Sequence, residues 1–128
     1  MMRCFRTFFA GGLLLLLLLG CRESGTRRYD VSGSVTFQGN PVPSGSISFD
    51  PVDGGLGGGF AAITDGRYDT SAEGRGHLGG PHNVVITGHT GQQIDPGNPD
   101  SGFEPLFPPY ETTVDLPSGR SSEDFTIP

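Results

Sequence analysis

The segment PHNVVITG, residues 81–88, carries the most continuous apolar pattern of the chain outside its N-terminal leucine run. His82, Val84 and Ile86 fall on one face of a strand, and Val85 makes the opposite face apolar as well. A strand that is apolar on both faces is typical of the interior of a sheet. We therefore expect this segment to form the central strand, with Val84 and Ile86 in the core.

Six other segments show alternation of apolar and polar residues, or a short apolar run between turn signals. They are residues 29–37, 46–50, 60–63, 67–70, 112–116 and 125–127. Asp65-Gly66 joins two of them and has the sequence of a type I′ turn, in which both central residues have positive φ. No segment has a helical repeat. The sequence predicts an all-β fold, a single seven-stranded antiparallel β-sandwich, with 29–37 and 46–50 as a hairpin or as neighbouring strands.

The N-terminus has the pattern of a secretory signal. Arg3 and Arg6 precede an apolar run that contains seven consecutive leucines and breaks at Gly20. A membrane-spanning helix needs about 20 predominantly apolar residues, and this run is shorter. We therefore expect residues 1–20 to be a signal peptide and the sandwich to form from the residues that follow it.

The end of this signal, Leu18-Leu19-Gly20-Cys21, resembles the bacterial lipobox. The resemblance implies that Cys21 is linked to diacylglycerol and becomes the mature N-terminus, with residues 21–28 as a tether and 29–128 as the domain. It places the protein in the cell envelope, anchored in a membrane and facing the periplasm or the cell exterior. The alternative is an ordinary signal peptide followed by an incidental cysteine.

The charge distribution excludes one class of partner. All fourteen acidic residues and six of the eight arginines follow residue 20, and the chain has no lysine. Such an acidic domain repels phosphate backbones, so nucleic-acid binding is not expected. Cys4 would leave with the signal and Cys21 would carry lipid, so we expect no disulfide within the mature chain.

The order of four short motifs resembles the carboxypeptidase regulatory-like, or transthyretin-like, domain. The motifs are Val31-Ser32-Gly33-Ser34-Val35, Gly39-Asn40-Pro41-Val42-Pro43-Ser44-Gly45, Asp65-Gly66-Arg67-Tyr68 and Gly80-Pro81-His82-Asn83-Val84-Val85-Ile86. Together with Cys21 and residues 105–116, they make the chain similar to small planctomycete lipoproteins that carry one such domain. The resemblance implies a prealbumin/Ig-like sandwich without catalytic activity.

Two functions other than a structural or protein-interaction role remain open. Binding of a small molecule, a glycan or calcium is the first, because Asp95, Asn98, Asp100 and Glu104 could offer oxygen ligands. Hydrolysis is the second, although the chain has neither a G-x-S-x-G nor an H-E-x-x-H motif. The three histidines lack the spacing of a zinc site. We expect a non-enzymatic protein without a cofactor.

Residues 89–109 contain five prolines and almost no alternation, so we expect neither a strand nor a helix there. At this length the segment exceeds an ordinary connection, which indicates either a functional loop or local disorder. It contains four apolar residues that no strand pattern requires: Ile94, Phe103, Leu106 and Phe107. We expect this loop to contact an envelope protein or a glycan. The alternative is that Leu106 and Phe107 fold back over an open end of the sandwich.

Overall fold

The strand predicted at the centre is the longest of the fold. The computed structural model describes residues 27–55 and 57–128, in which β7 (Gly80–Gln93) pairs with β3 (Ser44–Pro51) on one side and β9 (Tyr110–Leu116) on the other. Val84 and Ile86 are fully buried. The prediction of an interior strand with these two residues in the core is confirmed.

The regular secondary structure of the described residues is almost entirely β, which confirms the predicted fold class. Each of the seven predicted segments contains a strand. These strands are β1 (Val31–Phe37), β3, β4 (Gly59–Thr64), β5 (Arg67–Asp69), β7, β9 and β11 (Phe125–Ile127). Four short strands and one 3-10 helix complete the set, namely β2 (Asn40–Pro41), β6 (Gly74–Arg75), η1 (Pro99–Ser101), β8 (Phe103–Pro105) and β10 (Ser121–Ser122). The short strands have too few residues to show a period, so pattern alone does not reveal them.

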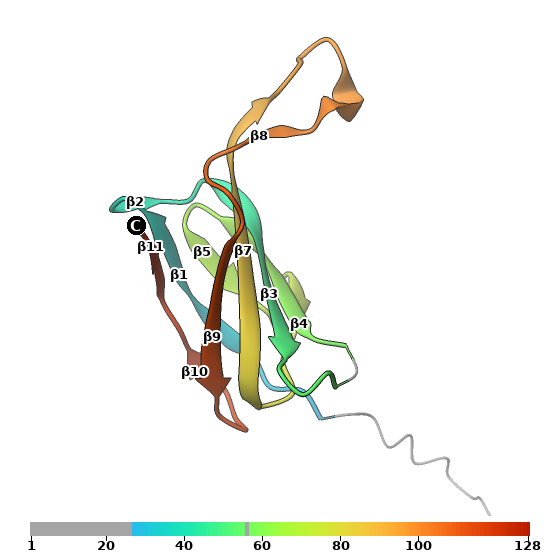
Figure 1. The fold of residues 1–128 in the computed structure, drawn as a ribbon, viewed down its shortest axis with the longest axis vertical. Helices are drawn as coiled ribbons and strands as arrows, with labels where there is room; N and C mark the ends of the chain where they lie inside the picture. Colours follow the sequence, from blue (N-terminus) through green and yellow to red (C-terminus); the bar gives the residue numbers. More distant parts are fainter. Residues whose placement is uncertain (1–26, 56) are drawn as a thin grey trace, which may run out of the picture.

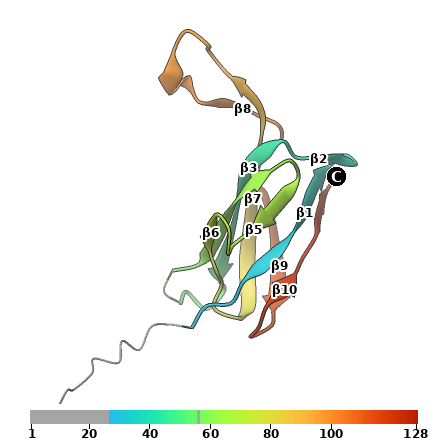
Figure 2. The ribbon, with the colours of Figure 1, turned by 180° about the vertical axis from the view of Figure 1, so that it is seen from behind.

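The sheet folds into two layers at the β4–β5 hairpin. Asp65 and Gly66 both have positive φ, as the type I′ turn requires, but the two strands pair only at Thr64 and Arg67 beside the turn. Beyond that pair they diverge, so that β4 continues one layer with β3, β7 and β9 while β5 joins β1 in the other. Figures 1 and 2 show these two layers from opposite sides.

Three aromatic rings fill the space between the layers. Phe49 of β3 lies 6.0 Å from Tyr68 of β5 and 6.5 Å from Phe125 of β11, measured between ring centroids. Tilted rings at this separation pack favourably. The inward-facing aliphatic residues of both layers surround them: Val31, Val35, Ile47, Ile63, Val84, Ile86 and Ile127. The core is therefore built from alternate positions of each strand.

β1 and β3 are not neighbours, so the expectation that 29–37 and 46–50 pair is wrong. β1 instead turns tightly through Gln38 and Gly39, which both have positive φ, and pairs with β2. Buried Val42 then leads the chain into the other layer, where β3 begins. The turn residues that end β1 thus form a hairpin with β2 instead of joining the two long strands.

The C-terminal strands run parallel to β1, which departs from a purely antiparallel arrangement. β10 pairs with the beginning of β1 and β11 with its end. Parallel pairing needs a connection that crosses between strands. The chain from β2 to β9 lies between β1 and these parallel partners, and residues 117–120 then carry it from β9 in one layer to β10 in the other.

Candidate functional site

The segment predicted to lack strands is an ordered hairpin, and that prediction is wrong. β7 continues to Gln93, and β8 pairs with it at Gln93↔Phe103 and His89↔Pro105, with a shift of register between the two pairs. Polar strand residues without alternation hid this extension, because cross-strand hydrogen bonding rather than burial holds it. We call residues 90–105 the arm, which projects from one end of the sandwich (Figure 1).

Side chains at the tip of the arm hydrogen-bond the local backbone. Asp95 Oδ1 accepts from the Gly97 amide at 3.0 Å, and Asn98 Oδ1 accepts from the Asp100 amide at 3.1 Å. The Ser101 hydroxyl accepts from the Asp95 amide at 3.0 Å. Asp and Asn play this part in many turns. Within the described residues no three His, Cys, Asp or Glu side chains gather as a metal site would require, so calcium binding gains no support at the tip.

The arm exposes two of the four apolar residues predicted as partner contacts. Ile94 is 63% exposed and Phe103 is 51% exposed. The Phe103 ring lies 6.4 Å from the ring of His89, near the base of the arm. Large apolar side chains on a projecting element are typical of contact surfaces.

The other two residues fold back onto the sandwich, which is the alternative that the sequence left open. Phe107 is buried, and its ring lies 5.0 Å from that of Phe37. Gly88 makes room for it, because a Cβ on that residue would lie 2.6 Å from the Phe107 ring. Leu106 is half-buried beside it, with its amide donating to the Gly88 carbonyl at 2.8 Å. Phe107 is therefore a core residue.

Leu106 and Phe107 also line an apolar groove at the base of the arm. This groove has a volume of about 390 Å³. Its other apolar walls come from Phe37, Pro108, Pro109, Tyr110 and Ile127. The arm and this groove adjoin at Pro105 and Leu106. All four predicted residues thus lie at one end of the molecule, two on the arm and two beside its base.

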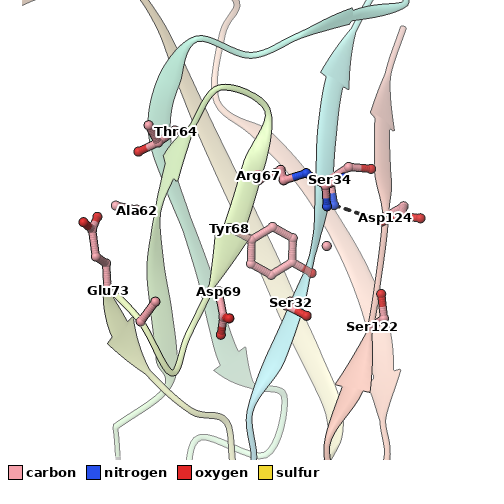
Figure 3. A pocket seen from close by; sticks show the side chains of 12 residues that line it. Ser32, Ser34, Ala62, Thr64, Arg67, Tyr68, Asp69, Glu73, Ser122 and Asp124 are labelled. Atoms are coloured by element: carbon pink, nitrogen blue, oxygen red, sulfur yellow. Dashed lines mark hydrogen bonds between the residues drawn. The ribbon is translucent and has the colours of Figure 1, made fainter.

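A second, polar groove lies on the outer side of the fold across β1, β5 and β4, with a volume of about 660 Å³ (Figure 3). Small residues form much of its surface, which leaves it open. Its hydroxyl side chains are those of Ser32, Ser34, Thr64 and Ser122, and its charged side chains are those of Arg67, Asp69, Glu73 and Asp124. Ser32, Ser34 and Arg67 lie in motifs that carry the family resemblance, but no pattern marked these residues as a site, because they come from separate strands and loops.

Two carboxylates of this polar groove support the local backbone. Asp124 Oδ1 accepts from the Ser34 amide at 2.9 Å, the bond drawn as a dashed line in Figure 3. Asp69 accepts from the hydroxyl and the amide of Ser71, and these hydrogen bonds lower the pKa of its carboxyl. The lowered pKa keeps the Asp69 carboxylate ionised at neutral pH.

The Tyr68 phenol beside this groove is locked in its neutral form. Its hydroxyl donates to the Glu123 carbonyl at 2.6 Å. Burial raises the pKa of Tyr68, and the charges of Glu123 and Asp124 raise it further. A general base or nucleophile works best with a pKa near the operating pH. The environment of the Tyr68 phenol moves its pKa away from neutral pH, so this phenol is not suited to act as a general base or nucleophile.

Several sequence predictions lie outside the described residues. These are the signal peptide 1–20, Cys21 and the tether as far as residue 26. Within residues 27–55 and 57–128, no helix is both long enough and apolar enough to cross a bilayer. No protein-family model, curated protein or solved structure matches this chain.

Proposed function

We propose that this protein is a non-catalytic, lipid-anchored module of the bacterial cell envelope, whose arm binds another envelope protein. The domain belongs, in this proposal, with the carboxypeptidase regulatory-like domains that its motifs resemble. The observation that carries the proposal is the ordered arm with exposed Ile94 and Phe103. Apolar side chains stabilise a fold when they are buried, so large apolar residues that a projecting hairpin exposes to solvent do not contribute to folding stability in this way. Contact with a partner would account for both features.

The charge of this end of the molecule indicates the chemistry of the partner. The arm has three carboxylates, Asp95, Asp100 and Glu104, and neither arginine nor lysine. Complementary charge steers association and rejects wrong partners. The partner surface in this proposal is therefore basic around an apolar centre that receives Phe103.

The lipid anchor in this proposal rests on the lipobox-like sequence before Cys21. Three arginines, Arg22, Arg27 and Arg28, lie near the proposed anchor, fewer than the roughly four to eight basic residues that bind anionic headgroups, so in this proposal a covalent anchor supplies the membrane attachment. The anchor places the module in the envelope, facing the periplasm or the cell exterior. The arm then contacts a protein of the same compartment.

Shortening the arm tests the interaction directly. Replacing residues 92–102 with a short Gly-Ser linker is expected to leave the unfolding midpoint unchanged, because none of these residues is buried. The same change is expected to abolish the co-purification of any partner that the wild-type chain retains from its own membranes. Circular dichroism during urea titration gives the first result, and affinity purification after solubilisation gives the second. An unchanged set of co-purified proteins would contradict the assignment, as would loss of folding.

The polar groove favours a second candidate function, the binding of a small polar molecule. Its volume lies in the range of ligand pockets, and it combines hydroxyl groups with the opposite charges of Arg67 and Glu73. A zwitterionic or polyhydroxylated molecule has matching chemistry. A compound that native mass spectrometry finds on the wild-type protein and not on Arg67→Ala would favour this candidate over the arm.

A further inference from the structure

Two histidines are fully buried beside each other at the end of the sandwich opposite the arm. His77 and His82 each have 0% exposure, and their ring centroids lie 5.6 Å apart in an edge-on arrangement with an interplanar angle of 76°. Neither Nε2 atom has a hydrogen-bond partner among the described residues. A buried polar atom without a partner is costly and rare in folded proteins.

The backbone fixes a different tautomer for each ring. His77 Nδ1 accepts from the Gly79 amide at 3.0 Å, so Nδ1 is unprotonated and the neutral ring carries its hydrogen on Nε2. His82 Nδ1 lies 2.8 Å from the Gly80 carbonyl, which only accepts, so His82 carries its hydrogen on Nδ1. One Nε2 is therefore a donor and the other an acceptor. No hydrogen bond joins the two Nε2 atoms directly, and while both rings are neutral a single bridging water molecule would accept from His77 Nε2 and donate to His82 Nε2.

This tautomer assignment argues against a metal ion between the rings. A metal at His77 Nε2 would need the hydrogen on Nδ1, where it would oppose the Gly79 amide hydrogen. Two neutral rings of complementary tautomer fit the backbone contacts of both residues.

The pair supports the start of the folded domain. The Tyr29 amide donates to the His77 carbonyl and the His77 amide donates to the Tyr29 carbonyl, both at 2.9 Å. The Arg28 guanidinium donates to the Gly76 carbonyl at 2.9 Å, and the Tyr29 ring lies 5.9 Å from that of His77. We call these contacts of residues 28–29 with 76–77 the N-terminal seam.

We propose that His77 and His82 form a pH-sensitive lock, in which two neutral rings of complementary tautomer hold the N-terminal seam closed and loosen it when either ring takes up a proton. Protonation would turn the acceptor on His82 into a second donor, or would place an unpaired charge in the core. The inference concerns the folded domain alone and holds whether or not Cys21 carries lipid.

The surroundings of the pair act on the pKa of His77 in both directions. Burial lowers the pKa of His77, and the neighbouring His82 lowers it further, while Asp30 acts in the opposite direction. Arg28 lies on the same N-terminal segment. On the strands beside His82, Asp50 precedes its partner Pro51 and Asp115 follows its partner Val114, and both aspartates are exposed at outward positions. No carboxylate among these contacts a ring nitrogen.

The direction of the pH effect follows from linkage. Because the pKa of His77 is lower in the folded state than the unfolded value of about 6.5, the unfolded chain binds the proton first as the pH falls. The stabilisation is complete above about pH 6.5 and decreases as the pH falls below it towards the folded pKa.

Long-range ¹H–¹⁵N NMR of the histidine rings tests the lock on the full chain in detergent micelles. At pH 7.5 we expect His77 protonated on Nε2 and His82 on Nδ1. At pH 6.5, where an ordinary imidazole is about half protonated, His77 should still be mainly neutral. The opposite tautomer on either ring, or a charged His77 at pH 6.5, would overturn the proposal.

Hydrogen exchange tests the consequence for the seam. After correction for intrinsic rates, the Tyr29 and His77 amides should lose protection several-fold between pH 7.5 and pH 5, relative to the Ile86 amide. The double variant His77→Asn/His82→Asn keeps a side-chain amide in place of each Nδ1 hydrogen-bonding atom and removes both titrating rings. The pH-dependent loss of amide protection should therefore disappear in this variant. An equal pH dependence of protection in the double variant would overturn the proposal. If the double variant does not fold, the NMR measurement on the wild-type protein decides whether the proposal holds.

Discussion

Replacing Cys21 with serine is expected to abolish the incorporation of fatty acid and to release the protein from the membrane fraction. Each buried methylene of an acyl chain contributes about 0.8 kcal/mol, so two or three chains on one residue would hold the protein almost permanently. A serine hydroxyl cannot form the thioether. The acidic mature chain offers no electrostatic substitute for the anchor.

The chain contains its own control for this experiment. Cys4 is the other cysteine, and Cys4→Ser should label as strongly as the wild type, because residue 4 lies in the predicted signal. Cells grown with a radioactive fatty acid give the measurement. Equal labelling of Cys21→Ser and Cys4→Ser would contradict lipidation at Cys21.

Replacing Ile86 with alanine is expected to lower the free energy of unfolding by about 2 to 5 kcal/mol. Ile86 is fully buried on β7, the strand that holds β3 and β9 together, and its removal leaves a cavity between the layers. No disulfide is expected to offset the loss. The effect is a large part of the roughly 5 to 15 kcal/mol that stabilises a typical domain.

Ile94→Ala is the matched control for this substitution. It removes the same atoms from a side chain that is 63% exposed on the arm, one residue beyond the end of the same strand. Urea denaturation of both variants should show a large shift of the midpoint for Ile86→Ala and almost none for Ile94→Ala. Similar shifts would mean that Ile86 does not lie in the core.

The sequence predicted the strands whose side chains alternate between core and solvent. Val84 and Ile86 are buried where the pattern places them, and the Asp65-Gly66 turn has the predicted backbone conformation. Pairing was harder to predict, because alternation shows which face of a strand is buried and not which strand lies beside it. Hence β1 was expected next to β3 and instead pairs with β2, β5 and the C-terminal strands.

The candidate sites could not be predicted from the sequence for a similar reason, because they depend on which segments lie side by side in the folded chain. Polar cross-strand pairing holds the arm, so its residues carry no hydrophobic period that would mark a strand. The polar groove combines residues of β1, β4, β5 and the C-terminal segment, which only the folded chain brings together. His82 did carry a signal, because it alternates in register with Val84 and Ile86 and is buried with them.

Site-specific photo-crosslinking in intact cells tests most directly the proposal that the arm binds an envelope protein. A photoreactive phenylalanine at position 103 is compared with one at position 60, since both phenylalanines are about half exposed, at 51% and 50%. Phe60 lies away from the arm, on β4 under the Arg75 guanidinium. We predict a discrete crosslinked protein from position 103 and none from position 60. Absence of a crosslink from position 103, or the same product from both positions, would contradict the proposed function.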